Sequence, residues 1–194
     1  MVLPAAAQAA PKSVASAYDH TMRLALGEYL VIQRGLAADR TKRLSRPAKR
    51  IERVALKALG TSGLTAHRRW GLRTLVEGAR QLRRGKTLAA KRRALRDISR
   101  PLAVWAVARR LAGIDVVHSA HAKAVWLQRS FLPLRNPYFG KTRVASGTVV
   151  AGPRKGEAFG AEDPHPTSFY PRQIILQLQK DARPAQKRTR AGGR

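Results

Sequence analysis

Basic side chains at helical spacing are the residues of this sequence best suited to do chemistry. Between Ser45 and Gly60 they recur every three or four positions, so on a helix they share one face: Arg46, Lys49, Arg50, Arg53 and Lys57. Guanidinium and ammonium groups bind phosphate, and arginine can do so through paired hydrogen bonds. Like charges at this spacing destabilise a helix that has no partner. We therefore expect this face to meet a polyanion.

Further candidate phosphate-binding residues lie outside this segment. Arginine outnumbers lysine in the chain, which suits paired contacts to phosphate and stacking on unpaired bases. The candidates come from an opening helix, the connection before Ser45, a second basic helical pattern and the C-terminal third. They are His20, Arg23, Lys42, Arg43, Arg68, Arg69, Arg73, Lys141, Arg143, Arg154, Lys155 and Arg172.

The overall charge balance supports the same expectation. Lys and Arg number 39 against 11 Asp and Glu in 194 residues, which gives a formal net charge of +28. Such self-repulsion disfavours a compact monomer unless RNA, DNA or an acidic membrane surface offsets it. Apolar residues still make up 44% of the chain, so it is not simply a disordered basic tail. We expect a small folded core coated with positive charge.

The sequence offers little to an enzyme or a metal site. It has no cysteine, and no Gly-x-Ser-x-Gly, His-Glu-x-x-His or phosphate-loop pattern occurs. His118 and His121 lie near Asp115, but a metal site needs further ligands. The apolar run 102–108 is far shorter than the roughly 20 residues that span a bilayer. We expect no catalysis, cofactor, metal, membrane span or small-molecule substrate.

Apolar periodicity predicts a chain that is mostly helical up to residue 131. Gly35, the Gly60–Gly63 break and Gly85 are placed to separate helices, and Ser45 and Ser99 are placed to cap them. Pro101 would then stand in the first turn of the helix that Ser99 opens. The predicted helices are 16–34, 45–59, 64–84, 87–96, 99–111 and 117–131.

The C-terminal third changes character and predicts strands. Residues 141–151 are rich in β-formers, and 173–179 alternates apolar with polar side chains. A Gly- and Pro-rich loop joins them, long enough to need a partner to order it. The predicted fold class is α+β: a mainly helical core packed on a small sheet with a long β-hairpin, plus disordered basic extensions. We divide the chain into a flexible arm (1–16), a single RNA-binding domain (17–179) and a basic tail (180–194).

Short motifs occur in the order found in one family of ribosomal proteins. The chain resembles the L-seventeen family of bacterial-type large-subunit ribosomal proteins. No single motif is specific, and their order from about residue 18 to 179 carries the resemblance. The matching segments are His20 with 22–26, 41–46, 55–57, 95–97, 138–144, 152–157 and 174–178.

The chain also departs from the family pattern. Residues 36–38 stand where the family has paired threonines and a leucine, and Arg43 replaces a glutamate. Insertions fall around 61–90, 112–135 and 157–171. Such divergence is more typical of a mitochondrial member than of a bacterial one, with a plastid or a bacterial cytoplasm as alternatives.

The resemblance implies a structural role in the large ribosomal subunit. The protein would bind and stabilise rRNA near the peptide exit region, beside neighbouring large-subunit proteins, without catalysis. The alternative from the residues alone is a DNA-binding or nucleic-acid-compacting protein. A basic peripheral membrane protein is a third, but the apolar faces are needed for the core.

Aromatic residues divide into core and surface candidates. The three tryptophans lie in helix-like apolar patterns and are expected in the core. Aromatic residues beside basic residues at loop borders are the better candidates for stacking on bases. These are Tyr138, Phe139, Phe169 and Tyr170, against Trp70, Trp105 and Trp126 for the core.

Overall fold

The computed structural model describes residues 14–141 and 146–159. In this part of the chain helices are followed by strands, and the predicted α+β class is confirmed. The helices are α1 (Val14–Ala37), α2 (Ser45–Leu59), α3 (Ala66–Arg84) and α4 (Leu88–Arg109). The strands are β1 (Ile114–Ser119), β2 (Ala124–Arg129), β3 (Gly147–Ala151) and β4 (Ala158–Phe159).

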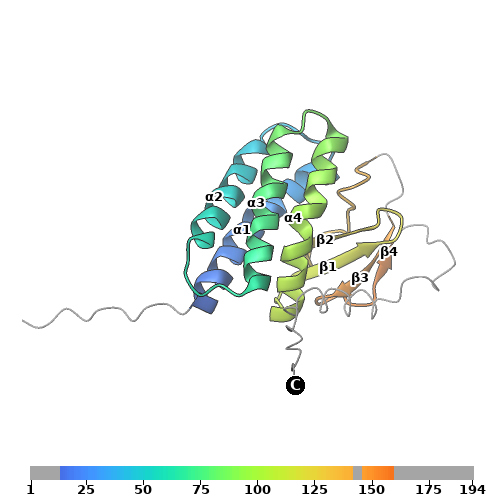
Figure 1. The fold of residues 1–194 in the computed structure, drawn as a ribbon. Coiled ribbons are helices and arrows are strands. Elements are labelled where there is room, and N and C mark those ends of the chain that lie inside the picture. Colours follow the sequence, from blue (N-terminus) through green and yellow to red (C-terminus); the bar gives the residue numbers. More distant parts are fainter. Residues whose placement is uncertain (1–13, 142–145, 160–194) are drawn as a thin grey trace, which may run out of the picture.

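The helices form a bundle with the sheet against one side. Consecutive helices run in opposite directions, and α2 packs between α1 and α3 (Figure 1). Helices α1 and α4 contact β2, so α2 lies on the side of the bundle away from the sheet (Figure 1). The bundle core holds fully buried Met22, Ile51, Leu75 and Leu102. Within residues 14–141 and 146–159 no helix is long and apolar enough to cross a bilayer.

The sheet is antiparallel throughout, with the order β2-β1-β3-β4. Strand β1 is central: Val117 pairs with Trp126 of β2 on one side and with Val149 of β3 on the other. All three side chains are fully buried. Strand β3 continues into a short hairpin with β4, and this pairing places the 152–157 turn beside the start of β1.

Glycine allows α3 to lie close to α4. Gly71 and Gly78 interrupt its apolar pattern, yet α3 is continuous. A Cβ on Gly78 would lie 2.8 Å from Ile98 Cγ1 of α4, so a larger residue would push the helices apart. The helix is capped by Thr65, whose hydroxyl accepts from the backbone N–H of Arg68. Gly85 ends it, as predicted.

The expected break between two helices at Ser99 is wrong, because α4 runs unbroken from Leu88 to Arg109 with Pro101 inside it. Ser99 is buried and donates back to the carbonyl of Leu95 instead of capping a new helix. Leu95, Ile98 and Leu102 form one continuous buried stripe. Tertiary packing of this stripe outweighs the backbone hydrogen bond that Pro101 cannot donate.

The expected helix over 117–131 is also wrong. This segment forms the end of β1, a turn, and β2. Lys123 in the turn has a positive φ of 47°, which a helix would not allow. Most side chains of both strands are buried, so the segment carries no clear alternation of apolar and polar residues, and helix and strand patterns look alike.

The first of the two predicted strand regions is found in part. Strand β3 begins at Gly147, inside the expected 141–151. Its expected partner, 173–179, lies outside the described residues, as do most of the predicted arm and the whole basic tail. Helix α1 begins at Val14, two residues ahead of the expected start, and it continues through Gly35 to Ala37, so the expected end at Gly35 is wrong.

Candidate nucleic-acid interface

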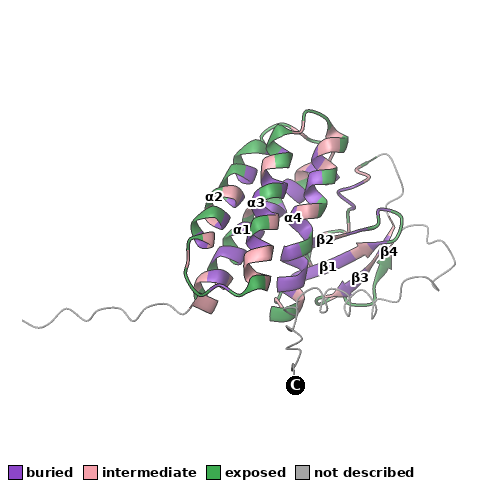
Figure 2. Cartoon of the chain, in the orientation of Figure 1, coloured by how far each residue is buried: buried purple, intermediate pink, exposed green. Residues whose placement is uncertain are grey.

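Helix α2 presents a row of basic side chains directly opposite its buried side. Ile51 and Ala55 are fully buried against the bundle. On the other side Arg46, Lys49, Arg53 and Lys57 are exposed, and we name these four residues the α2 basic face. Figure 2 shows this outer side of α2 as largely exposed. The spacing predicted from the sequence therefore gives one continuous cationic surface.

Carboxylates flank the α2 basic face but do not neutralise it. On the side towards α1, Arg50 Nη1 donates to Glu28 Oε1 at 2.8 Å. On the side towards α3, Glu52 accepts from Arg80 Nε at 2.8 Å and Arg83 Nη1 at 2.5 Å. These bonds, that from Arg80 first, hold the pKa of Glu52 below its usual range. No member of the α2 basic face has an ion-pair partner among the described residues.

The N-terminal end of α2 adds to the positive potential. Its cap residue is Leu44 and not the expected Ser45, Leu44 makes no side-chain hydrogen bond, and the first turn holds no acidic residue. Lys42 and Arg43 in the preceding turn are exposed. The first N–H groups of a helix and its dipole favour an anion at this end. Lys42 and Arg43 thus extend the α2 basic face towards a helix terminus suited to phosphate.

Other carboxylates tie separate elements together. Asp39, after α1, accepts from the backbone N–H of Lys141 at 2.9 Å and from the Arg92 guanidinium of α4. The Lys141 N–H and Arg92 hold the pKa of Asp39 below its usual range. Asp19 of α1 accepts from Trp105 Nε1 and pairs with Arg109, both on α4. These carboxylates tie elements of the fold together, and neither of them pairs with a residue of the α2 basic face.

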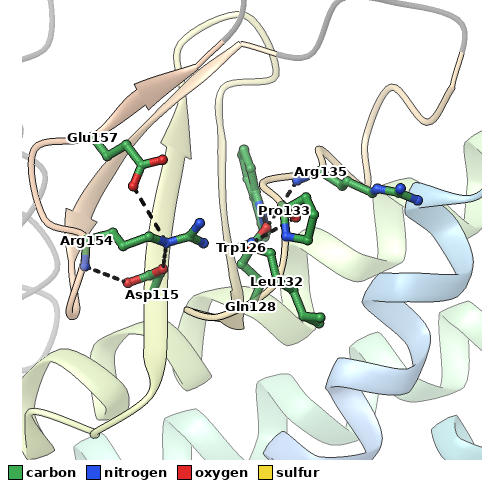
Figure 3. A network of polar contacts seen from close by, with 8 residues as sticks. All are labelled: Asp115, Trp126, Gln128, Leu132, Pro133, Arg135, Arg154 and Glu157. Atoms are coloured by element: carbon green, nitrogen blue, oxygen red, sulfur yellow. Dashed lines mark hydrogen bonds and ion pairs between the residues drawn. The ribbon is translucent and has the colours of Figure 1, made fainter.

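Arg154, a predicted site residue, lies in a buried ion pair. Its Nε donates to Asp115 Oδ2 at 2.7 Å and its backbone N–H to Asp115 Oδ1 at 3.1 Å (Figure 3). Asp115 is fully buried, and Glu157 lies 3.7 Å from the same Nε. Arg154 thus holds the β3–β4 turn against β1. Its neighbour Lys155 is exposed and remains available to a partner.

The remaining predicted site residues are divided between contacts and solvent. Arg23 lies over the Trp105 ring at 6.0 Å, and Arg68 over the Tyr18 ring at 5.6 Å. The others that the structure describes are exposed or half-buried: His20, Arg69, Arg73 and Lys141. Arg143 and Arg172 lie outside the described residues.

The aromatic residue most open to a base was missed by sequence reasoning. Tyr138 is buried and donates to the carbonyl of Val125 at 2.7 Å, so it cannot stack on RNA. Phe131 is 73% exposed, with the Arg129 guanidinium 5.8 Å from its ring centre. Phe131 was overlooked because a helix was wrongly expected over 117–131. A lone aromatic between Ser130 and Pro133, just after a strand, is the signal that could have revealed it.

The tryptophans and histidines have structural surroundings. Trp126 is fully buried and Trp105 nearly so, whereas Trp70 is half-buried and stacks on His67. His118 lies in β1 and His121 in the turn after it, so they do not share a helix face. No group of three or more His, Asp or Glu within the described ranges is placed to hold a metal.

No family model, no curated protein and no solved structure matches this chain.

Proposed function

We propose that this protein is a structural constituent of the large ribosomal subunit, in mitochondria, and that it binds rRNA through the α2 basic face. The proposal rests on which charged side chains around α2 are paired and which are not. The carboxylates nearest α2 are engaged with arginines at the helix–helix contacts, while Arg46, Lys49, Arg53 and Lys57 face solvent together. A polyanion relieves their mutual repulsion.

The mechanism is charge neutralisation on a rigid frame. Arginine and lysine side chains along a straight helix meet successive phosphates and release counterions from the RNA. Double-helical RNA is recognised largely by shape and backbone rather than by base edges. Binding of this kind is salt-sensitive and allows RNA segments to pack closely together.

The ribosomal assignment rests on the order of the sequence motifs. Among the segments that resemble the L-seventeen family, 41–46 leads into α2, 95–97 lies in α4 and 152–157 forms the β3–β4 turn. The first of these contributes Lys42, Arg43 and Arg46 to the proposed interface. The placement near the peptide exit, with neighbouring large-subunit proteins, comes from the same resemblance.

Sedimentation tests the ribosomal assignment. A native cell or organelle lysate is run on a density gradient, untreated or after RNase or DNase, and this protein is followed through the fractions. We expect it to travel with the large subunit in high salt and to be released by RNase. A protein that follows DNA and responds only to DNase would instead be a DNA-binding or compacting protein.

A charge variant tests the α2 basic face directly. We expect K49Q/R53Q to reduce the slope of log affinity against log salt for an RNA hairpin by about 1.5, since each lost phosphate contact is worth about 0.7–0.9. The matched control is R93Q/K123Q, which removes the same charge from exposed positions on α4 and the β1–β2 turn. Equal slopes for the two variants would show that overall charge, and not this face, binds RNA.

A further inference from the structure

A small hollow lies between the C-terminal turns of α1 and the loop after β2. Gln33, Arg34 and Ala37 of α1 form one wall, and Leu132, Pro133 and Arg135 form the other. Its volume is about 240 Å³. Sites for drug-sized ligands are typically about 300–1,000 Å³. The hollow therefore suits one planar group of the size of a nucleobase.

The loop wall is held in place by two buried glutamines. Gln128 Nε2 donates to the carbonyls of Leu132 and Pro133, both at 3.3 Å. Its Oε1 accepts from Arg135 N at 3.3 Å and from Trp126 Nε1 at 3.2 Å (Figure 3). Gln33 Nε2 donates to the Arg135 carbonyl at 3.3 Å. The wall is pre-organised, which lowers the entropy cost of binding.

The polar groups left open around the hollow are complementary to a nucleotide. The Gln33 side chain is buried and lines the hollow, and because its Nε2 donates to Arg135, its carbonyl oxygen is the amide atom that can accept from a ligand. Arg34 and Arg135 are exposed at the rim, and the lining contains no carboxylate. Leu132 and Pro133 supply an apolar surface. The acceptor fits a base N–H, the apolar wall fits the face of the base, and the two cations fit a phosphate.

A larger hollow of about 390 Å³ at the end of α4 lacks this combination. It is lined mostly by alkyl groups of α4, β1 and the 151–153 turn, with Arg110 as its only charged residue. It has no buried amide to recognise a polar group. The two hollows thus differ in chemistry as well as in size.

We propose that the hollow between α1 and the 132–135 loop binds a single unpaired nucleotide of RNA. The base enters between Gln33 and Pro133, and its phosphates lie on Arg34 and Arg135. Phe131, one residue before this loop, offers its exposed ring to a neighbouring base. This inference rests on the proposed RNA-binding function and gives it a site that recognises more than backbone shape.

The test compares two RNA hairpins that differ only in one bulged nucleotide. Stacking and pocket contacts of a single base are worth about 1–3 kcal/mol, which is about 5- to 150-fold in affinity. We expect the full-length protein to bind the bulged hairpin at least about fivefold tighter than the fully paired one. With 4-thiouridine at the bulge, illumination should cross-link the RNA to the 131–135 segment.

Two variants examine the pocket without disturbing the α2 basic face. R34Q/R135Q removes the rim cations, and A37L fills the hollow from the α1 side. We expect both to lose the preference for the bulge, and A37L to keep wild-type affinity for the paired hairpin. The control K49Q/R53Q should weaken both hairpins alike and keep their ratio.

Each outcome bears on a separate proposal. No preference in the wild-type protein, or a preference that survives both pocket variants, would overturn the nucleotide pocket while leaving RNA binding intact. Failure to bind either hairpin would instead overturn the proposed function. If a short acidic peptide binds the wild-type protein but not R34Q/R135Q, and the hairpins bind equally, the hollow is a site for protein carboxylates.

Discussion

The outer side of α2 and the seam between the bundle and the sheet use polar residues in opposite ways. At the seam, where α1 and α4 meet β2, polar atoms bond to one another and are shut away from water. Tyr29 and Ser99 share a hydrogen bond of 2.9 Å, and Ser99 contacts Tyr138 at 3.1 Å. On the α2 basic face, Lys49 and Arg53 have no such partners within the described chain.

The seam network reaches the backbone of β2 at two points. Tyr29 Oη accepts from Leu127 N at 3.2 Å, and Tyr138 Oη donates to the carbonyl of Val125 at 2.7 Å. Burial raises the pKa of both phenols well above the ordinary value, so both stay neutral. The network thereby fixes the sheet on the helices without burying charge, which would be costly.

The comparison shows that the polar groups bonded to one another within the fold lie apart from the basic side chains that have no ion-pair partner among the described residues. The hydrogen bonds that join Tyr29, Ser99 and Tyr138 at the seam are made within the chain. The α2 basic face has no ion-pair partner among the described residues, and an anion would relieve its repulsion. Substitutions in the two regions should therefore change different measured quantities, stability in one and RNA affinity in the other.

The largest expected effect is the loss of stability when Arg154, a basic residue paired within the fold, is replaced. R154A leaves Asp115 buried without its cation, and removal of one partner from a buried ion pair costs about 3–5 kcal/mol. Because the Arg154 side chain is partly exposed, we expect about 3 kcal/mol in the free energy of unfolding, measured with urea. The control K155A changes an exposed residue of the same turn and should cost under about 0.5 kcal/mol. Equal free energies of unfolding for R154A and K155A would mean that neither residue stabilises the fold and that both act only in contact with a partner.

Sequence patterns predicted the elements whose one side meets solvent. Helices α1, α2 and α3 show a clear apolar stripe, and α2 shows the basic stripe opposite it. The pattern failed where both sides are buried, as in β1 and β2, since a period of two is then hidden. It also failed at Pro101, where the local rule for proline was overridden by packing of the whole of α4.

Which arginines pair with carboxylates of the fold and which face solvent could not be predicted from the sequence. The sequence marks Arg50, Arg53 and Arg154 alike as candidate phosphate-binding residues, but only the fold brings Glu28 to the first and Asp115 to the last. The hollow between α1 and the 132–135 loop was harder still to predict, because its residues Gln33 and Arg135 are 102 positions apart in the sequence. Sites formed by such long-range contacts depend on topology that local patterns do not encode.

A second prediction concerns charge inside the sheet. Burial lowers the pKa of His118 to about 4 from 6.5. The unfolded chain then binds a proton more tightly, so stability is full above pH 6.5 and falls as the pH drops towards 4. We expect this histidine to contribute on the order of 2 kcal/mol to that loss, followed as urea midpoints against pH.

The variant H118Q should flatten that pH profile between 6.5 and 4. H121Q, which replaces the exposed histidine of the neighbouring turn, serves as its control and should follow the wild type. If H118Q and the wild type lose stability in parallel, another group is responsible for the pH dependence and the interior of the sheet tolerates the charged imidazole.

A third prediction compares two glycines in helices. A Cβ on Gly78 would lie 2.8 Å from Ile98 Cγ1 and 3.1 Å from the Ile98 backbone nitrogen, whereas one on Gly27 would meet nothing within 4 Å. Overpacking costs about 1–3 kcal/mol, and the gain in helix propensity offsets roughly 1 kcal/mol. We expect G78A to lower stability by about 1 kcal/mol and G27A to raise it by about 0.5–1 kcal/mol, as measured by urea unfolding. A stabilised G78A would show that the contact between α3 and α4 can relax.

The smallest expected effect is that of replacing Glu52, which lies between the α2 basic face and α3. E52Q removes the carboxylate that binds Arg80 and Arg83 beside the α2 basic face. These pairs are partly exposed, so stability should fall by no more than about 1 kcal/mol. The two freed arginines then add to the basic face, and affinity for an RNA hairpin should rise by less than about tenfold. The control E77Q makes the same charge change at an exposed position on α3, where Glu77 accepts a hydrogen bond from Gln81 and pairs with no arginine among the described residues. If E77Q raises affinity as much as E52Q, the gain comes from net charge. If E52Q alone raises it, carboxylates at the helix contacts limit how much of the arginine surface RNA can reach.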